Sequence, residues 1–185
     1  MDTEREVLGG TSINWGAVKG VGILLMVLGA VAILVPALAS WGVTIFIGWI
    51  LIFGSVFLFA SAFSYRRGSS LLVGIIWAVL ALAAGLYLLI DPGQGTKTLT
   101  LILMIYFLVS GVFKIAVAVA GRGEPGIGWL AVNGVLSVII GLIILADMPD
   151  AADWAIGLLV GIDFIFAGWG LISLGMAGRE LEGRG

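Results

Sequence analysis

Six long apolar stretches constrain this chain more than any other feature of its sequence. Each is about 20 residues long, which is the length of α-helix that crosses the hydrocarbon core of a bilayer. None alternates apolar and polar residues as a membrane β-strand does, and in lipid only a helix satisfies its own backbone. The sequence therefore predicts an all-α membrane protein with six transmembrane helices. The predicted spans are about 17–39, 41–63, 70–90, 98–120, 127–146 and 154–175.

The composition agrees with a lipid solvent and excludes several classes of function. Of the 185 residues, 61% are hydrophobic and 11% are charged, and the mean hydropathy is +1.22. A soluble domain is about 45–50% apolar and about 25% charged. The chain has no Cys and no His, so disulfides are excluded and we expect no metal and no cofactor. The net charge of −2, without a basic patch, gives no reason to expect a nucleic-acid partner.

Lysine and arginine side chains gather on one side of the predicted spans. Seven lie on that side, Lys97 lies on the other, and Lys114 falls within a span. The positive-inside rule then places both termini in the cytoplasm. Residues 1–15 form a cytoplasmic segment, residues 16–176 the transmembrane domain and residues 177–185 a cytoplasmic tail. The seven are Arg5, Lys19, Arg66, Arg67, Arg122, Arg179 and Arg184.

Two short motifs bear on topology. Tyr65-Arg66-Arg67, between the second and third spans, is interpreted as a topology anchor, with binding to anionic lipid head groups as the alternative. Ala37-Leu38-Ala39 resembles a signal-peptidase site. The apolar run before it is too long for a signal peptide, so we expect the first span to be retained.

Small residues and prolines recur along the chain with a period of 56 or 57 residues. Each repeat contains two spans, so successive repeats enter the membrane in the same direction. We therefore predict three tandem parallel helical hairpins, over about 16–64, 70–121 and 126–176, arranged as a pseudo-three-fold bundle. Each odd span closes on a proline. The recurring positions are Gly22, Ala78 and Gly134; Gly29, Gly85 and Gly141; Gly54, Gly111 and Gly168; and Pro36, Pro92 and Pro149.

The recurring glycines predict close contact between helices. The two small residues of each odd span are seven positions apart, which is about two helical turns, so they share one face. Small residues let helix backbones approach closely in a membrane. A substrate groove along the same face is the alternative. The predicted packing residues are Gly22, Gly29, Gly54, Gly85, Gly111, Gly134, Gly141 and Gly168.

This arrangement resembles the HdeD family of bacterial inner-membrane proteins. The resemblance rests on three tandem hairpins, on the Gly…Gly…Pro pattern of each odd span and on a glycine near the middle of each even span, and it covers about residues 16–175. It implies six transmembrane helices and a link to acid resistance or general stress, and it carries no catalytic residues across. The chain departs from a strict repeat at Met148, which makes the third connection one residue longer.

Two ionisable side chains fall inside predicted spans, where such groups are costly and are functional candidates. Asp163 lies near the middle of the sixth span and Lys114 lies near the cytoplasmic end of the fourth. Folding the chain about its turns puts Lys114 level with Asn133 and Asp163 level with Ser137. Because Asn133 and Ser137 are four residues apart on one helix face, the four side chains form a possible polar track.

This polar track has three interpretations. In the first, Lys114 reaches towards the cytoplasmic interface and Asp163 caps a local hydrogen-bond network. In the second, Lys114 and Asp163 form a buried charged pair. In the third, Asp163 responds to protons, because acidification would neutralise its carboxylate.

The sequence favours a non-enzymatic membrane protein of the HdeD type that contributes to acid or general stress tolerance. Its expected partners are the lipid bilayer and either further copies of itself or other membrane proteins. The alternative is a small transporter or channel with a pathway near Asp163, although such pathways normally carry more polar groups than these spans do. An intramembrane enzyme would need a base and a nucleophile, for which few side chains are present.

Overall fold

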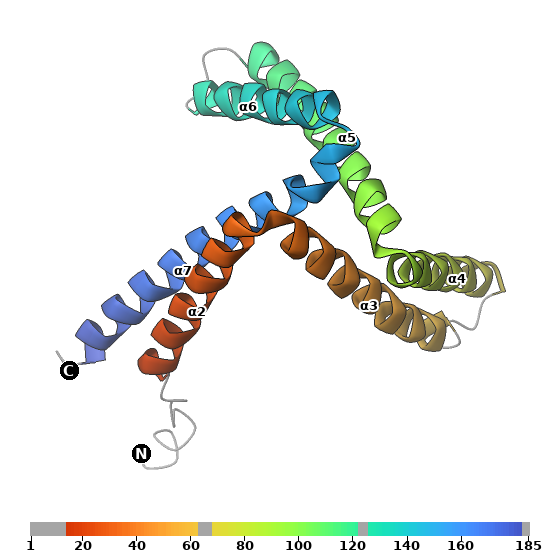
Figure 1. Cartoon of the computed structure of the whole chain (residues 1–185), viewed down its shortest axis with the longest axis horizontal. Helices are drawn as coiled ribbons and strands as arrows, with labels where there is room; N and C mark the ends of the chain where they lie inside the picture. Colours follow the sequence, from red (N-terminus) through yellow and green to blue (C-terminus); the bar gives the residue numbers. More distant parts are fainter. Residues whose placement is uncertain (1–13, 63–67, 122–125, 183–185) are drawn as a thin grey trace, which may run out of the picture. The chain divides into compact units, whose positions relative to one another are not determined.

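The computed structural model describes residues 14–62, 68–121 and 126–182, and these ranges contain only helices and short turns (Figure 1). Six of the helices are long and apolar enough to cross a membrane, as the sequence predicts. The elements are α2 (Trp15–Leu34), α3 (Pro36–Ala62), α4 (Gly68–Ile90), α5 (Pro92–Ala120), α6 (Ile127–Ala146), the 3-10 turn η1 (Asp150–Asp153) and α7 (Ala155–Glu182).

Two of the three repeat prolines begin helices instead of ending them, which corrects the predicted boundaries. Pro36 and Pro92 are the first residues of α3 and α5, while α2 and α4 already end at Leu34 and Ile90. Proline suits the first helical position because its missing N–H would have no partner in the helix and its φ is already helical. The Asp91 carboxylate caps α5 by accepting a hydrogen bond from the Gln94 backbone N–H at 3.1 Å.

The chain forms two compact units, and each is described by itself. The terminal unit joins the segment up to Leu34 to the segment from Val160 onwards, so it contains α2 and most of α7. The central unit runs from Val35 to Leu159 and contains α3 to α6, η1 and the first residues of α7.

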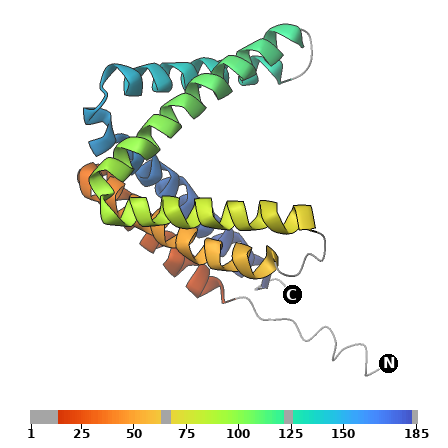
Figure 2. The ribbon, with the colours of Figure 1, turned by 90° about the vertical axis from the view of Figure 1, so that its right-hand side faces the viewer.

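In the central unit, α3 packs along α4 and α5 packs along α6, and both α3 and α5 contact η1 (Figure 1). A small apolar cluster of Ile144, Ala151 and Ala155 lies beside η1. The helices α4 and α5 diverge from their junction, as Figure 2 shows. The prediction that residues 70–121 form a packed hairpin is therefore wrong. Only Asp91 separates the two helices, whereas antiparallel neighbours usually need a loop of about 2–8 residues.

In the terminal unit, α2 packs against α7. Gly22 lies against Gly168 and Gly29 lies against Gly161. The first odd span thus pairs with the last even span. In the central unit, both pairs join an even span to the odd span that follows it, and in the terminal unit the last even span packs against the first odd one. The repeat is present, but in the central unit the packed pairs are α3–α4 and α5–α6 instead of a hairpin of α4 and α5.

Candidate functional site: helix seams and two polar clusters

The packed helix pairs meet along seams of small residues, where the two backbones touch. A Cβ atom added at Gly168 would lie 2.5 Å from the carbonyl oxygen of Gly22. One added at Gly111 would lie 2.8 Å from the carbonyl oxygen of Gly134, and one at Gly85 would lie 2.8 Å from that of Gly48. Real Cβ atoms do not approach this closely, so only glycine permits these seams. Gly29 and Gly141 also lie in seams, against Gly161 and Leu108.

Gly54 is the exception among the predicted packing residues. A Cβ atom added there would meet nothing within 4 Å, so the prediction that Gly54 packs against another helix is wrong. The seam position belongs to Ser55, which is 3% exposed. The prolines explain this shift: Pro36 and Pro92 are 56 residues apart, and only the third connection carries the extra Met148. The repeat-equivalent residues of the even spans are therefore Ser55, Gly111 and Gly168.

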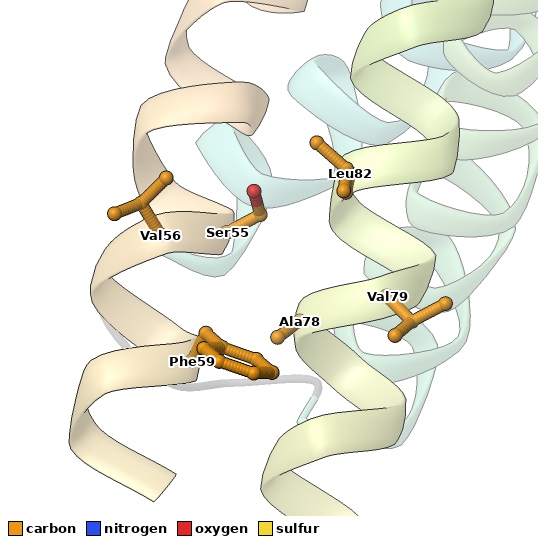
Figure 3. A pocket seen from close by; sticks show the side chains of 6 residues that line it. All are labelled: Ser55, Val56, Phe59, Ala78, Val79 and Leu82. Atoms are coloured by element: carbon orange, nitrogen blue, oxygen red, sulfur yellow. The ribbon is translucent and has the colours of Figure 1, made fainter.

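A pocket of about 300 Å³ opens beside Ser55 on the α3–α4 pair (Figure 3). Ser55 and Ala78 both line this pocket, and their repeat-equivalent positions in the other two pairs are glycines in contact with each other. The Ser55 hydroxyl donates to the backbone carbonyl of Ile52 at 2.7 Å, so it does not reach into the pocket as a free donor. The remaining lining residues are apolar: Val56, Phe59, Val79 and Leu82.

The first polar cluster joins α5 to α6 and contains three of the predicted polar residues. The Lys114 ammonium donates to Asn133 Oδ1 at 3.0 Å and to Ser137 Oγ at 3.4 Å. The Ser137 hydroxyl is buried and donates to the Asn133 carbonyl at 2.9 Å. Ser137 lies one turn further into α6 than Asn133. Because the ammonium bonds to both side chains, it lies level with this turn of α6. Lys114 is thus bonded within the helix pair, and the interpretation that it reaches towards the interface stays a prediction.

Asp163 lies in the terminal unit, on the exposed face of α7. It makes no hydrogen bond and no ion pair with the described residues of that unit. Its predicted proximity to Ser137 and its predicted pairing with Lys114 concern residues of the central unit, so both stay predictions. Its proposed response to protons is likewise untested.

The second polar cluster was missed by the sequence analysis and lies where α3, α5 and α7 begin in the central unit. The hydroxyls of Thr44 and Thr96 are 2.8 Å apart, and each also lies within hydrogen-bond distance of the carbonyl four residues earlier. Because each hydroxyl has one hydrogen, one threonine donates to the other hydroxyl and the other threonine donates to its own carbonyl. The Ser40 hydroxyl accepts a hydrogen bond from the Gly157 N–H at 2.9 Å, which caps the start of α7. All three side chains are buried, with exposed fractions of 0–1%.

The 56-residue spacing of the repeat also indicates the residues of this second cluster. Ser40 and Thr96 are 56 residues apart, and so are Thr44 and Thr100. In the third repeat, the equivalent positions are Asp153 and Gly157. The Thr100 hydroxyl is buried and has no hydrogen-bond partner among the described residues.

Replacing Thr44 by valine is expected to lower the free energy of unfolding by about 1 kcal/mol, because a buried hydroxyl pair is lost while the side-chain shape is kept. Thr98→Val is the control, because Thr98 is exposed and should cost less than about 0.5 kcal/mol. Unfolding in mixed micelles with added dodecyl sulfate measures both. Equal effects of the two variants would show that the Thr44–Thr96 contact does not stabilise the fold.

Several predicted features lie outside the described residues. These are the Tyr65-Arg66-Arg67 anchor, the segment 1–13, and four of the seven basic side chains assigned to the cytoplasmic side, namely Arg5, Arg66, Arg67 and Arg122. The side chains of Arg179 and Arg184 also lie outside the described part.

Six apolar helices joined by small-residue seams define a multi-pass helical protein of membrane type, built from tandem repeats. Residues 20–90 and 76–146 both match the short repeat of unknown function (DUF308). The second match is shifted by 56 residues, from 20 to 76 and from 90 to 146, which is the spacing of Gly22, Ala78 and Gly134. The matches together span more than half of the chain, so the protein belongs to the DUF308 short-repeat family. No curated protein and no solved structure matches it.

Proposed function

We propose that this protein is a non-enzymatic, multi-pass protein of the bacterial inner membrane, of the HdeD type, that contributes to acid or general stress resistance. Both termini lie in the cytoplasm, and the bilayer is its principal partner. One observation carries the proposal: the described helix pairs are sealed by backbone contact at Gly22–Gly168, Gly85–Gly48 and Gly111–Gly134. A seam of this kind leaves no room for water, so it suits a protein that limits proton entry or shapes the bilayer.

The cyclic pairing of spans supports a pseudo-three-fold arrangement of the repeats. An even span packs on the next odd span in the central unit, and the last even span packs on the first odd span in the terminal unit. Three equivalent pairs related by a 56-residue or 57-residue step fit a closed ring. We propose that further copies of the chain, or other membrane proteins, cover part of the exposed apolar faces.

The hydrogen bonding of the polar side chains also supports a structural role. Lys114 and Ser137 bond within one helix pair, and Ser40, Thr44 and Thr96 bond within the central unit. A solute or ion pathway needs polar groups that face water instead of each other. The pocket beside Ser55 is lined by apolar side chains apart from that serine, which suits an acyl chain better than a polar solute.

A small transporter or channel is the second candidate, and Asp163 is the observation that favours it. This carboxylate sits in a spanning helix on an exposed face, without a hydrogen-bond partner in the described part of its unit. Ionisable groups at this depth usually mark ion or proton pathways.

Proton flux into proteoliposomes separates the two candidates. We expect liposomes with the wild-type protein to acidify no faster than liposomes with Asp163→Asn, because the sealed seams carry no protons. An inward flux that depends on Asp163 would favour the transporter. In cells, deletion of the protein should lower survival after acid shock, and both the wild type and Asp163→Asn should restore it. Full survival of the deletion strain under acid and other stresses would contradict the proposed role.

A further inference from the structure

We propose that Lys114 and Asn133 form a binding site for a phosphate group at one edge of the α5–α6 pair. The phosphate could belong to the head group of an anionic lipid or be free in solution. The proposal does not depend on the stress role of the protein, because it rests on the charge, the free donors and the position of these two side chains.

The first argument is the charge of Lys114. The groups that accept its hydrogen bonds, Asn133 Oδ1 and Ser137 Oγ, are both neutral. The acidic side chains in the described part of the central unit lie at the opposite ends of the helices, so none neutralises the ammonium. These are Asp91, Asp147, Asp150 and Asp153. A cation inside a spanning helix is costly, and it normally pairs with an anion or a dipole.

The second argument is the set of unused donors. The ammonium has three N–H groups and uses two of them. Because the Asn133 carboxamide oxygen accepts from Lys114, its NH₂ group points elsewhere and keeps two N–H donors. Asn133 is exposed and Lys114 is half-buried, so these donors are accessible at the surface of the pair. The buried Ser137 hydroxyl holds the ammonium in place by accepting one of its hydrogen bonds. Phosphate oxygens accept several charge-assisted hydrogen bonds at once, which matches this donor set.

The third argument is the depth of the site. Lys114 lies six residues before the end of α5, or about 9 Å along its axis. Trp129 lies one turn before Asn133 on the same face of α6 and is 75% exposed, as a tryptophan at the membrane–water boundary is. The donors therefore sit one turn inside that boundary, within reach of a head-group phosphate. The location favours a lipid as the source of the phosphate.

Retention of phosphatidylglycerol by the detergent-purified full-length protein tests the site, with native mass spectrometry as the readout. The wild type is expected to retain phosphatidylglycerol about fivefold more tightly than Lys114→Met does, which is the effect of one lysine near a lipid surface. Lys114→Arg should restore most of the difference. Asn133→Leu should give an intermediate loss, because it keeps the charge and removes the amide donors.

Lys19→Met is the matched control, because it removes the same charge from α2 at a position without a hydrogen-bonded cradle, and it should retain the lipid like the wild type. Phosphatidylcholine and inorganic phosphate complete the comparison. Displacement of phosphatidylglycerol by millimolar inorganic phosphate, dependent on Lys114, would support the site with free phosphate as its source. Equal retention by the wild type and Lys114→Met, with both variants folded by circular dichroism, would overturn the proposal. So would a loss that Lys19→Met reproduces.

Discussion

Leucine in place of Gly168 is expected to destabilise the terminal unit by about 3 kcal/mol, the upper part of the range for overpacked positions. A Cβ atom at this position would lie 2.5 Å from the carbonyl oxygen of Gly22 and 2.7 Å from the side chain of Met26. The oxygen belongs to a helix backbone and cannot move aside as a flexible side chain can. The two helices must therefore separate, which removes the dispersion contacts that hold helices together in lipid.

Gly170→Leu provides the matched control, since it lies two residues away on the same helix and its Cβ would meet nothing within 4 Å. It should change the free energy of unfolding by less than about 0.5 kcal/mol. Dodecyl sulfate titration in mixed micelles measures both variants against the wild type. If Gly168→Leu and Gly170→Leu unfold at the same dodecyl sulfate fraction, the α2–α7 seam is not a close backbone contact.

The six spans could be predicted because their signal is local. A stretch of about 20 apolar residues identifies a spanning helix whatever it packs against. The faces of these helices were also readable, since two glycines seven residues apart must share a face. The helix that packs against each face could not be predicted. Which face meets which helix depends on the connections, and a single residue such as Asp91 is too short to fold α4 and α5 side by side.

The error at Gly54 has a related origin. The glycines at 54, 111 and 168 have equal spacings of 57, but the connections between the spans do not have equal lengths. The structural equivalence runs through Ser55, whose small hydroxyl side chain takes the place of a glycine. Residue identity suggested one alignment of the repeats, whereas the positions of the prolines indicated the correct one.

The polar residues show the same division between what could and could not be predicted. Folding the chain about its turn brought Lys114 level with Asn133, because α5 and α6 are a true antiparallel pair. The same operation for Asp163 assumed a simple hairpin between α6 and α7. Because Asp163 and Ser137 lie in different units, their predicted proximity stays a prediction. The hydroxyl cluster at Ser40, Thr44 and Thr96 needed the three-dimensional meeting of helix starts, which no local pattern reveals.

Alanine in place of Gly157 is expected to cost about 3 kcal/mol, although it adds only one methyl group. Gly157 lies against the backbone of Pro36, and an added Cβ would contact the carbonyl oxygen of that residue and lie 3.0 Å from its Cα. The start of α7 would have to move away from α3. Gly42→Ala is the control, because a Cβ at Gly42 meets nothing within 4 Å, and it should cost less than about 0.5 kcal/mol.

A double-mutant cycle with Ser40 distinguishes this clash from a general loss of stability. Ser40→Ala removes the side chain that accepts the Gly157 N–H and should cost about 1 kcal/mol by itself. If Gly157→Ala already displaces the start of α7, that hydrogen bond is broken beforehand, and adding Ser40→Ala should cost almost nothing more. The two effects would then fall short of additivity by at least about 0.5 kcal/mol, as expected for residues in direct contact. Full additivity would mean that α7 keeps its position on α3 despite the added methyl group, and that the Ser40 cap and the Gly157 contact act independently.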